Sequence, residues 1–194
     1  EEEGVSNASA VHAALLSSLP YTAAATAMLL NARHSRMTGE RRYHLAGSIA
    51  VGSVGLCLAG LALGSGASPV LTLLSLLVAA GGVWGVQGPL LSWPASFLSG
   101  EAAATGASLV NTVGAFSGFV GPYAVGFFVQ RLAGNAGFAA ASFFLAAVIG
   151  AAFPLSLWAM RGGAGTSTHA HPSLKFAPLS IEEDGTRESE LTSL

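Results

Sequence analysis

Charged residues are scarce in this chain. They make up 9% of its 194 residues, whereas a typical soluble domain carries roughly 25%. A soluble fold needs many more charged side chains to cover its surface, so the composition argues against a soluble domain. The formal net charge of -2 argues against a strongly basic domain, and therefore against nucleic acid as a partner. The single cysteine, Cys57, allows no internal disulfide.

The sequence motifs of enzymes and metal sites are also missing. We find no paired cysteines, no His-x-x-x-His, no Gly-x-Ser-x-Gly and no phosphate-binding loop. His169 and His171 lie two apart in a polar stretch and are interpreted as solvated, while His12 and His44 flank apolar segments, where histidine is unremarkable. The sequence therefore predicts no enzyme, no cofactor and no metal.

Long apolar runs dominate the chain. Hydrophobic residues make up 52% of it, and the mean hydropathy is +0.59. Between residues 45 and 160 the only Asp, Glu, Lys or Arg residues are Glu101 and Arg131. About 20 apolar residues suffice for a helix to cross a bilayer, and backbone amides in hydrocarbon must be satisfied within the segment. We therefore predict five helical spans, at about 12–30, 45–64, 68–98, 102–130 and 136–160.

These spans predict an all-α fold, a polytopic transmembrane helix bundle over residues 12–160. Residues 1–11 are expected to form an extracytoplasmic segment. Residues 161–194 are polar and rich in Ser and Thr, with too little apolar surface to fold, so we expect a disordered cytoplasmic tail.

The stretch RHSRMTGERR, residues 33–42, holds four of the eight Lys and Arg side chains. Short loops rich in Arg and Lys stay on the cytoplasmic side of a membrane. If this stretch joins the first two spans inside, alternation of the spans places seven of the eight cationic residues inside. The cluster is thus a topology signal, and a second, mechanical role is left open.

Three stretches in this order resemble one family. RHSRMTGERR resembles the loop between helices eight and nine of major facilitator superfamily transporters. GPLLSWPASFLSGEAAATGASLVNTVGAFSGFVGPYAVGF and FAAASFFLAAVIGAAF resemble helices ten to twelve of its anion:cation symporter branch. The resemblance implies a partial major-facilitator fold and alternating-access transport of small organic anions, with a proton or sodium ion as the coupling partner. It also implies that this chain is a fragment, with an amino-terminal half expected upstream.

The arginine-rich stretch would be a gating loop in this family. Its residues are Arg33, Arg36, Gly39, Glu40, Arg41 and Arg42. Gly39, Glu40 and the two arginines after them match the family pattern, but Arg36 stands where the family has an aspartate that helps to hold the inner gate. Because the sign of the charge is reversed there, a charge latch must use Glu40 or has been lost.

Four polar or aromatic residues are candidates for substrate binding: Asn111, Gln87, Trp93 and Tyr21. Asn111 lies within an apolar span and either binds a neighbouring helix or faces a central cavity. Gln87 and Trp93 surround the break that Gly88-Pro89 and Pro94 make in the third span, although a tryptophan also anchors helices at the interface. Tyr21 faces either the cavity or a packing neighbour.

The fourth span carries small residues on one face. Gly114, Gly118, Pro122 and Gly126 follow each other at intervals of four, which places them on the same side of a helix. Such a face lets two helices approach closely, and it also allows one to slide on the other. Gly52 in the second span is expected to lie on no such face, so a bulky residue is predicted to be milder there.

The alternative function is a nontransporting membrane scaffold, or a truncated remnant that only associates with other helices. The sequence predicts an integral multi-pass protein and leaves the substrate and the membrane open.

Overall fold

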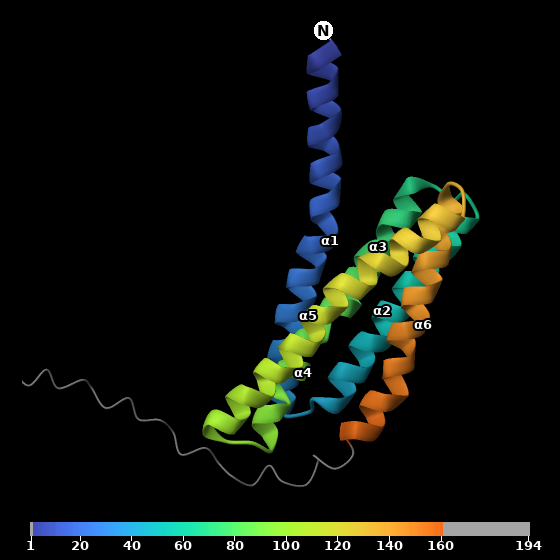
Figure 1. The fold of residues 1–194 in the computed structure, drawn as a ribbon. Helices are drawn as coiled ribbons and strands as arrows, with labels where there is room; N and C mark the ends of the chain where they lie inside the picture. Colours follow the sequence, from blue (N-terminus) through green and yellow to red (C-terminus); the bar gives the residue numbers. More distant parts are fainter. Residues whose placement is uncertain (1, 161–194) are drawn as a thin grey trace, which may run out of the picture.

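The computed structural model of the protein describes residues 2–160, which form a bundle of helices without a β-strand (Figure 1). The helices are α1 (Glu2–Thr38), α2 (Arg42–Gly64), α3 (Pro69–Gly85), α4 (Gln87–Ser92), η1 (Pro94–Ser96), α5 (Gly100–Arg131) and α6 (Asn135–Ala159). Five helical segments are long and apolar enough to cross a membrane, which confirms the predicted fold class. The predicted tail at residues 161–194 lies outside the described residues.

Glycine marks each turn between the long helices. Gly39, Gly66, Gly100 and Gly134 have φ angles of 69°, 65°, 56° and 58°, which L-residues with a side chain rarely adopt. Each of them lies at the junction of two consecutive spans. Gly66, Gly100 and Gly134 fall in the gaps between the predicted spans, which confirms where the chain turns there.

The third span is interrupted, as the sequence predicts. Ser68 caps its start, because the hydroxyl accepts a hydrogen bond from the Leu71 N–H at 3.4 Å and Pro69 occupies the first turn. α3 then ends at Gly85, α4 begins at Gln87, and η1 begins at Pro94. Since proline lacks an N–H, Pro89 and Pro94 prevent one continuous helix here.

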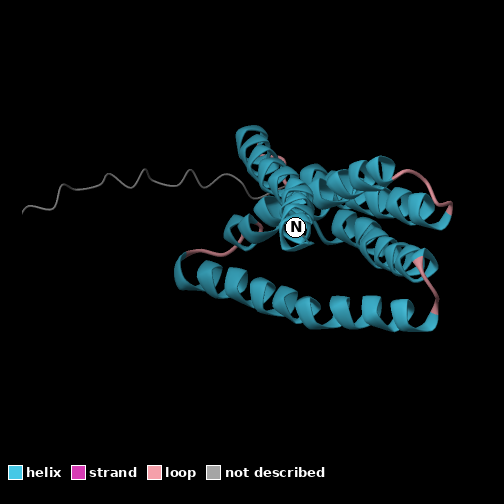
Figure 2. Ribbon diagram, turned by 90° about the horizontal axis from the view of Figure 1, so that it is seen from above, coloured by secondary structure: helices cyan, strands magenta, loops and turns pink. Residues whose placement is uncertain are grey.

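The helices pack through small residues rather than through large ones. α2 lies between α3 and α6, α1 packs on α3, and α5 contacts α6 along with α4 and η1 (Figures 1 and 2). The buried side chains are mostly alanine: Ala24, Ala46, Ala59, Ala62, Ala79, Ala139, Ala141 and Ala146. Large apolar side chains remain exposed on every long helix, as expected of a surface solvated by lipid.

One predicted boundary is wrong. α1 begins at Glu2, so residues 2–11 are helical, but the part of α1 that could cross a membrane begins at Ala13, and the extracytoplasmic position of residues 1–11 stays a prediction. α1 also extends to Thr38, which places Arg33 and Arg36 in its last turns. The loop between the first two spans is therefore only Gly39, Glu40 and Arg41. The helix continues from residue 31 to residue 38 because Ser, Ala and Arg are compatible with it and no Gly or Pro lies between residue 31 and Gly39.

The expectation for Gly52 is also wrong, because its α2 backbone lies directly against α3. A Cβ added at Gly52 would lie 2.9 Å from the backbone nitrogen of Val83, and one added at Gly82 would overlap Gly52. A Cβ added at Gly55 would lie still closer to the backbone of Ala79. The α2–α3 contact is thus a small-residue interface of the membrane-bundle type.

Candidate functional site

Two cavities lie on opposite faces of α3. The first, here the Tyr21–Trp84 pocket, measures about 510 Å³ and is bordered by α1, α2 and α3. The second, here the polar groove, measures about 630 Å³ and lies between α1 and α2 over the glycine face of α3. Because successive helical residues turn by about 100°, Ala80 and Trp84 point away from Gly81 and Gly85, and the two cavities are separate.

The Tyr21–Trp84 pocket combines apolar walls with two aromatic side chains. Tyr21 follows Pro20 in α1, and Trp84 lies one residue before the end of α3. Their exposed fractions are 71% and 44%, so both rings remain accessible to a ligand. An apolar pocket with a phenol and an indole can stack on a ring or donate hydrogen bonds to oxygen atoms. Of the predicted substrate residues, only Tyr21 lines this pocket.

The structure separates Gln87 and Trp93 from Tyr21. Gln87 is half-buried at the start of α4, two residues beyond the end of α3. Trp93 packs against the cluster formed by Leu45, Ile49 and Met160. It also meets Phe97 edge to face, with ring centroids 5.6 Å apart. In this bundle Trp93 therefore serves packing between helices.

Asn111 lies in the exposed part of α5. Every residue from 111 to 120 is exposed, and no side chain of α5 is buried. No described residue lies within 4 Å of a Cβ added at Gly114, Gly118 or Gly126. Pro122 is exposed as well, and α5 continues through it. Residues 2–160 therefore contain no partner for the predicted small-residue face, and its packing role stays a prediction.

The arginine-rich turn is held by local hydrogen bonds. Gly39 adopts its left-handed conformation, and the Glu40 carboxylate accepts a hydrogen bond from the Tyr43 N–H at 3.3 Å. Glu40 thus stabilises the exposed start of α2, because a carboxylate interacts favourably with the positive end of the helix dipole. Ser35 is 2% exposed and donates to the carbonyl of Glu40 at 3.2 Å. Whether this turn gates transport stays a prediction.

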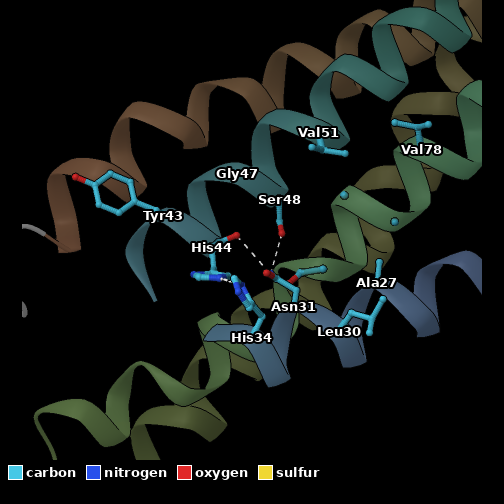
Figure 3. Close-up of a pocket in the computed structure, with 13 residues that line it drawn as sticks. Ala27, Leu30, Asn31, His34, Tyr43, His44, Gly47, Ser48, Val51 and Val78 are labelled. Atoms are coloured by element: carbon cyan, nitrogen blue, oxygen red, sulfur yellow. Dashed lines mark hydrogen bonds between the residues drawn. The ribbon is translucent and has the colours of Figure 1, made fainter. Parts of the chain in front are cut away.

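Asn31 joins three helices at one end of the polar groove (Figure 3). Its amide nitrogen lies 2.7 Å from the Gly85 carbonyl oxygen of α3 and 2.9 Å from Ser48 Oγ of α2. It also reaches the His44 carbonyl oxygen at 3.4 Å. One partly buried amide thereby holds the ends of α1, α2 and α3 together. Asn31 is not among the site residues predicted from the sequence.

His34 and His44 face each other beside Asn31, one from α1 and one from α2. His34 Nδ1 lies 2.6 Å from His44 Nε2, and the ring centroids are 4.8 Å apart. At this separation one nitrogen carries the hydrogen and the other accepts it. The two residues are ten apart in the chain and flank the short turn, so only the hairpin brings them together. The interpretation of His44 as unremarkable missed this pair.

The described glutamate and arginine side chains lie towards the ends of the helices or in the turns. Glu101 occupies the first turn of α5 and Arg131 its last turn, where Arg131 stacks 5.2 Å from the centroid of Phe127. Among residues 2–160 no three His, Cys, Asp or Glu side chains gather to hold a metal.

The chain is similar to part of several membrane transport proteins. It is 41% identical over 119 residues to a "Putative tartrate transporter" of Agrobacterium vitis, an alignment covering 61% of this chain and 25% of that protein. It is 37% identical over 110 residues to the inner membrane transport protein RhmT of Escherichia coli (strain K12), an alignment that covers 57% of this chain and 24% of that protein. It is also 33% identical over 134 residues to a quinolone resistance transporter of Acinetobacter baumannii, and this alignment covers 69% of this chain and 29% of that protein.

The alignments span between 24% and 29% of the length of these relatives. No protein-family profile and no solved structure matches the chain. The five long apolar helices and the similarity to transporters together identify an integral, multi-pass membrane protein related to transporters.

Proposed function

We propose that this chain is the part of a major-facilitator-type secondary transporter that contains helices eight to twelve. The whole protein would move small organic anions across the membrane by alternating access. The similarity of the bundle to a protein named as a tartrate transporter carries this proposal. The interrupted third span supports it, because discontinuous helices line the substrate sites of many transporters.

The Tyr21–Trp84 pocket is the part of the substrate site that this chain would supply. Tyr21 and Trp84 offer hydrogen-bond donors and apolar contact area, and Gln87 lies at the adjacent helix break. The described spans carry no charged side chain away from their ends, so the group that neutralises the anion would come from the amino-terminal half. The coupling ion, a proton or sodium, would also be bound there.

The exposed face of α5 is where we expect that half to pack. Asn111, Gly114 and Gly118 lie on a helix that contacts its own bundle through α6, α4 and η1. A partner helix could approach the glycines closely and offer Asn111 a hydrogen bond.

A chimera tests the proposal. The stretch of the Agrobacterium vitis protein that aligns with this chain is replaced by the corresponding residues of this chain, and tartrate uptake is measured in cells. We expect saturable uptake by the chimera, and no saturable flux when the 194-residue chain is reconstituted alone in liposomes.

Paired tryptophan variants locate the site within the chimera. Trp84→Leu should lower uptake several-fold at equal protein level, whereas Trp158→Leu should not, because Trp158 lies on α6 outside the pocket and is 69% exposed. A chimera that is inserted, monodisperse and inactive would favour the scaffold alternative. Robust flux by the chain alone would favour an oligomeric pore.

A further inference from the structure

The polar groove has the shape of a site for a molecule with a head and a tail. Its apolar end is formed by Ala27, Leu30, Val51 and Val78, and its polar end by Asn31, His34, Tyr43, His44 and Ser48. The lining residues of α1 run from 27 to 34, which corresponds to about 10 Å along the helix. The groove therefore changes from hydrocarbon-like to polar within two helical turns.

Glycine keeps the groove empty. Gly47 lines it from α2, and nothing lies within 4 Å of a Cβ added there. Gly81 lines it from α3, where an added Cβ would reach only Ala27, at 3.5 Å. Described side chains thus leave open space between α1 and α2, and in a bilayer lipid chains would reach it.

The polar end of the groove lies next to a positive charge. Four arginines and one glutamate occupy residues 33–42, which leaves three net positive charges at the turn. Arg42 places its guanidinium 5.4 Å from the ring centroid of Tyr43, which lines the groove. Basic clusters at the cytoplasmic surface attract anionic lipids, and basic pockets between transmembrane helices hold their head groups.

Two polar atoms at this end have no partner among residues 2–160. Arg42 Nε and His44 Nδ1 are both buried without a hydrogen bond, although the other ring nitrogen of His44 pairs with His34. Both nitrogens are covered by the protein itself, so a molecule in the groove meets the exposed parts of the basic side chains instead, such as those of Arg33 and Arg36. A phosphate group supplies strong acceptor oxygens of the kind that a guanidinium N–H requires.

We infer that the polar groove binds an anionic phospholipid of the cytoplasmic leaflet. One acyl chain lies against Gly47 and Gly81, and the phosphate lies beside His34, Tyr43 and the arginines of the turn. The inference relies on the cytoplasmic orientation of the turn that the proposed function assumes. It is independent of which solute is transported.

The experiment uses the 194-residue chain purified in detergent. Bound lipid is counted by native mass spectrometry after addition of phosphatidylglycerol or phosphatidylcholine with identical acyl chains. We expect several-fold tighter binding of phosphatidylglycerol. Equal binding of the two lipids would overturn the inference. If inorganic phosphate raised the thermal unfolding midpoint as much as phosphatidylglycerol does, the inference would also be overturned, because the site would then take a soluble anion.

Two kinds of variant separate the head from the tail. Gly47→Leu fills the open groove and should lower binding of both lipids, whereas Gly114→Leu, also in open space but on α5, should leave it unchanged. The double variant Arg41→Gln, Arg42→Gln should reduce the preference for phosphatidylglycerol over phosphatidylcholine. Both lipids should still bind this variant, but more weakly than they bind the unchanged chain. Equal binding by the Gly47→Leu and Gly114→Leu proteins, or an unaltered preference in the double variant, would contradict the inference. The circular dichroism of each variant shows whether it is folded.

The result does not depend on transport. Lipid selectivity that survives in an inactive chimera would support the lipid site and reject the transport proposal. Uptake of tartrate without lipid selectivity would support the transport proposal and reject the lipid site.

Discussion

The backbone of Gly52 in α2 lies directly against the backbone of Gly82 in α3. A Cβ added at Gly52 would lie 2.9 Å from the Val83 nitrogen and 3.2 Å from the Gly82 carbonyl carbon, closer than side chains normally pack. α2 also contacts α6, so it is the central helix of the bundle. This close backbone contact therefore involves α2, the helix that packs against both α3 and α6.

We predict that Gly52→Leu destabilises the bundle. The side chain would force α2 and α3 apart, and overpacking typically costs about 1–3 kcal/mol. Unfolding of the purified chain in detergent, followed by circular dichroism as temperature rises, measures the effect. Gly47→Leu is the matched control, because it lies on the same helix with nothing within 4 Å of the added Cβ. Equal unfolding midpoints for the two variants would show that the α2–α3 contact is looser than described.

A second prediction concerns Gly118, and it differs between the isolated chain and a complete transporter. In the isolated chain Gly118→Leu should leave the unfolding midpoint unchanged, since the added side chain enters open space. In the chimera with the relative's amino-terminal half it should lower folded yield or uptake, because the proposed partner helix would pack there. Measuring both proteins tests the predicted small-residue face, and tolerance in both would mean that this face of α5 contacts lipid.

Charge and hydropathy were sufficient to predict the membrane bundle. The near absence of charge from residue 45 to 160 defines spans that the structure confirms, and glycines define their turns. Glycine spacing was less informative about packing. Gly114 and Gly118 form a regular pattern with no described partner, whereas Gly52 and Gly55 are three apart and pack closely on α3. A small residue permits close approach, but the rest of the fold decides which helix comes near.

The polar groove could not be predicted from local sequence. Asn31, His34 and His44 are single polar residues beside apolar segments, and each alone is compatible with the membrane interface. Their convergence depends on a turn of only three residues, and the predicted end of the first span lies near residue 30 instead of residue 38. Had the first helix been predicted to end at residue 38, His34 would have been expected one helical turn before the hairpin and opposite the start of α2.

The third prediction is that Asn31→Asp destabilises the bundle. The amide nitrogen of Asn31 donates to Gly85 and His44 carbonyl oxygens, and a carboxylate would place an acceptor against two acceptors. Leaving partly buried acceptors without their donor costs at most about 1–3 kcal/mol. The matched control is Asn135→Asp, where the new carboxylate occupies the start of α6 and favours the helix dipole. Equal unfolding midpoints for the two variants would show that Asn31 does not hold the three helices.

The fourth prediction concerns topology and needs exposed probe positions. Ser35 is 2% exposed, so a cysteine there would react poorly even on the accessible side of the membrane. Met37 is 72% exposed at the arginine-rich turn, and Ser65 is exposed at the opposite end of α2. Since Arg and Lys are retained on the cytoplasmic side, the turn at Met37 should be inside and Ser65 outside.

The measurement uses Cys57→Ala as the background, since Cys57 is the only native thiol. An impermeant maleimide should label Ser65→Cys in intact cells and Met37→Cys only after permeabilisation. Met37 lies in the last turn of α1, just before α2, and Ser65 directly follows α2. The 23 residues of α2 are about 35 Å long and sufficient to cross the hydrocarbon core. Labelling of Met37→Cys but not of Ser65→Cys in intact cells would invert the topology. It would also remove the cytoplasmic leaflet as the source of a lipid in the polar groove, because the arginines would then face the opposite surface.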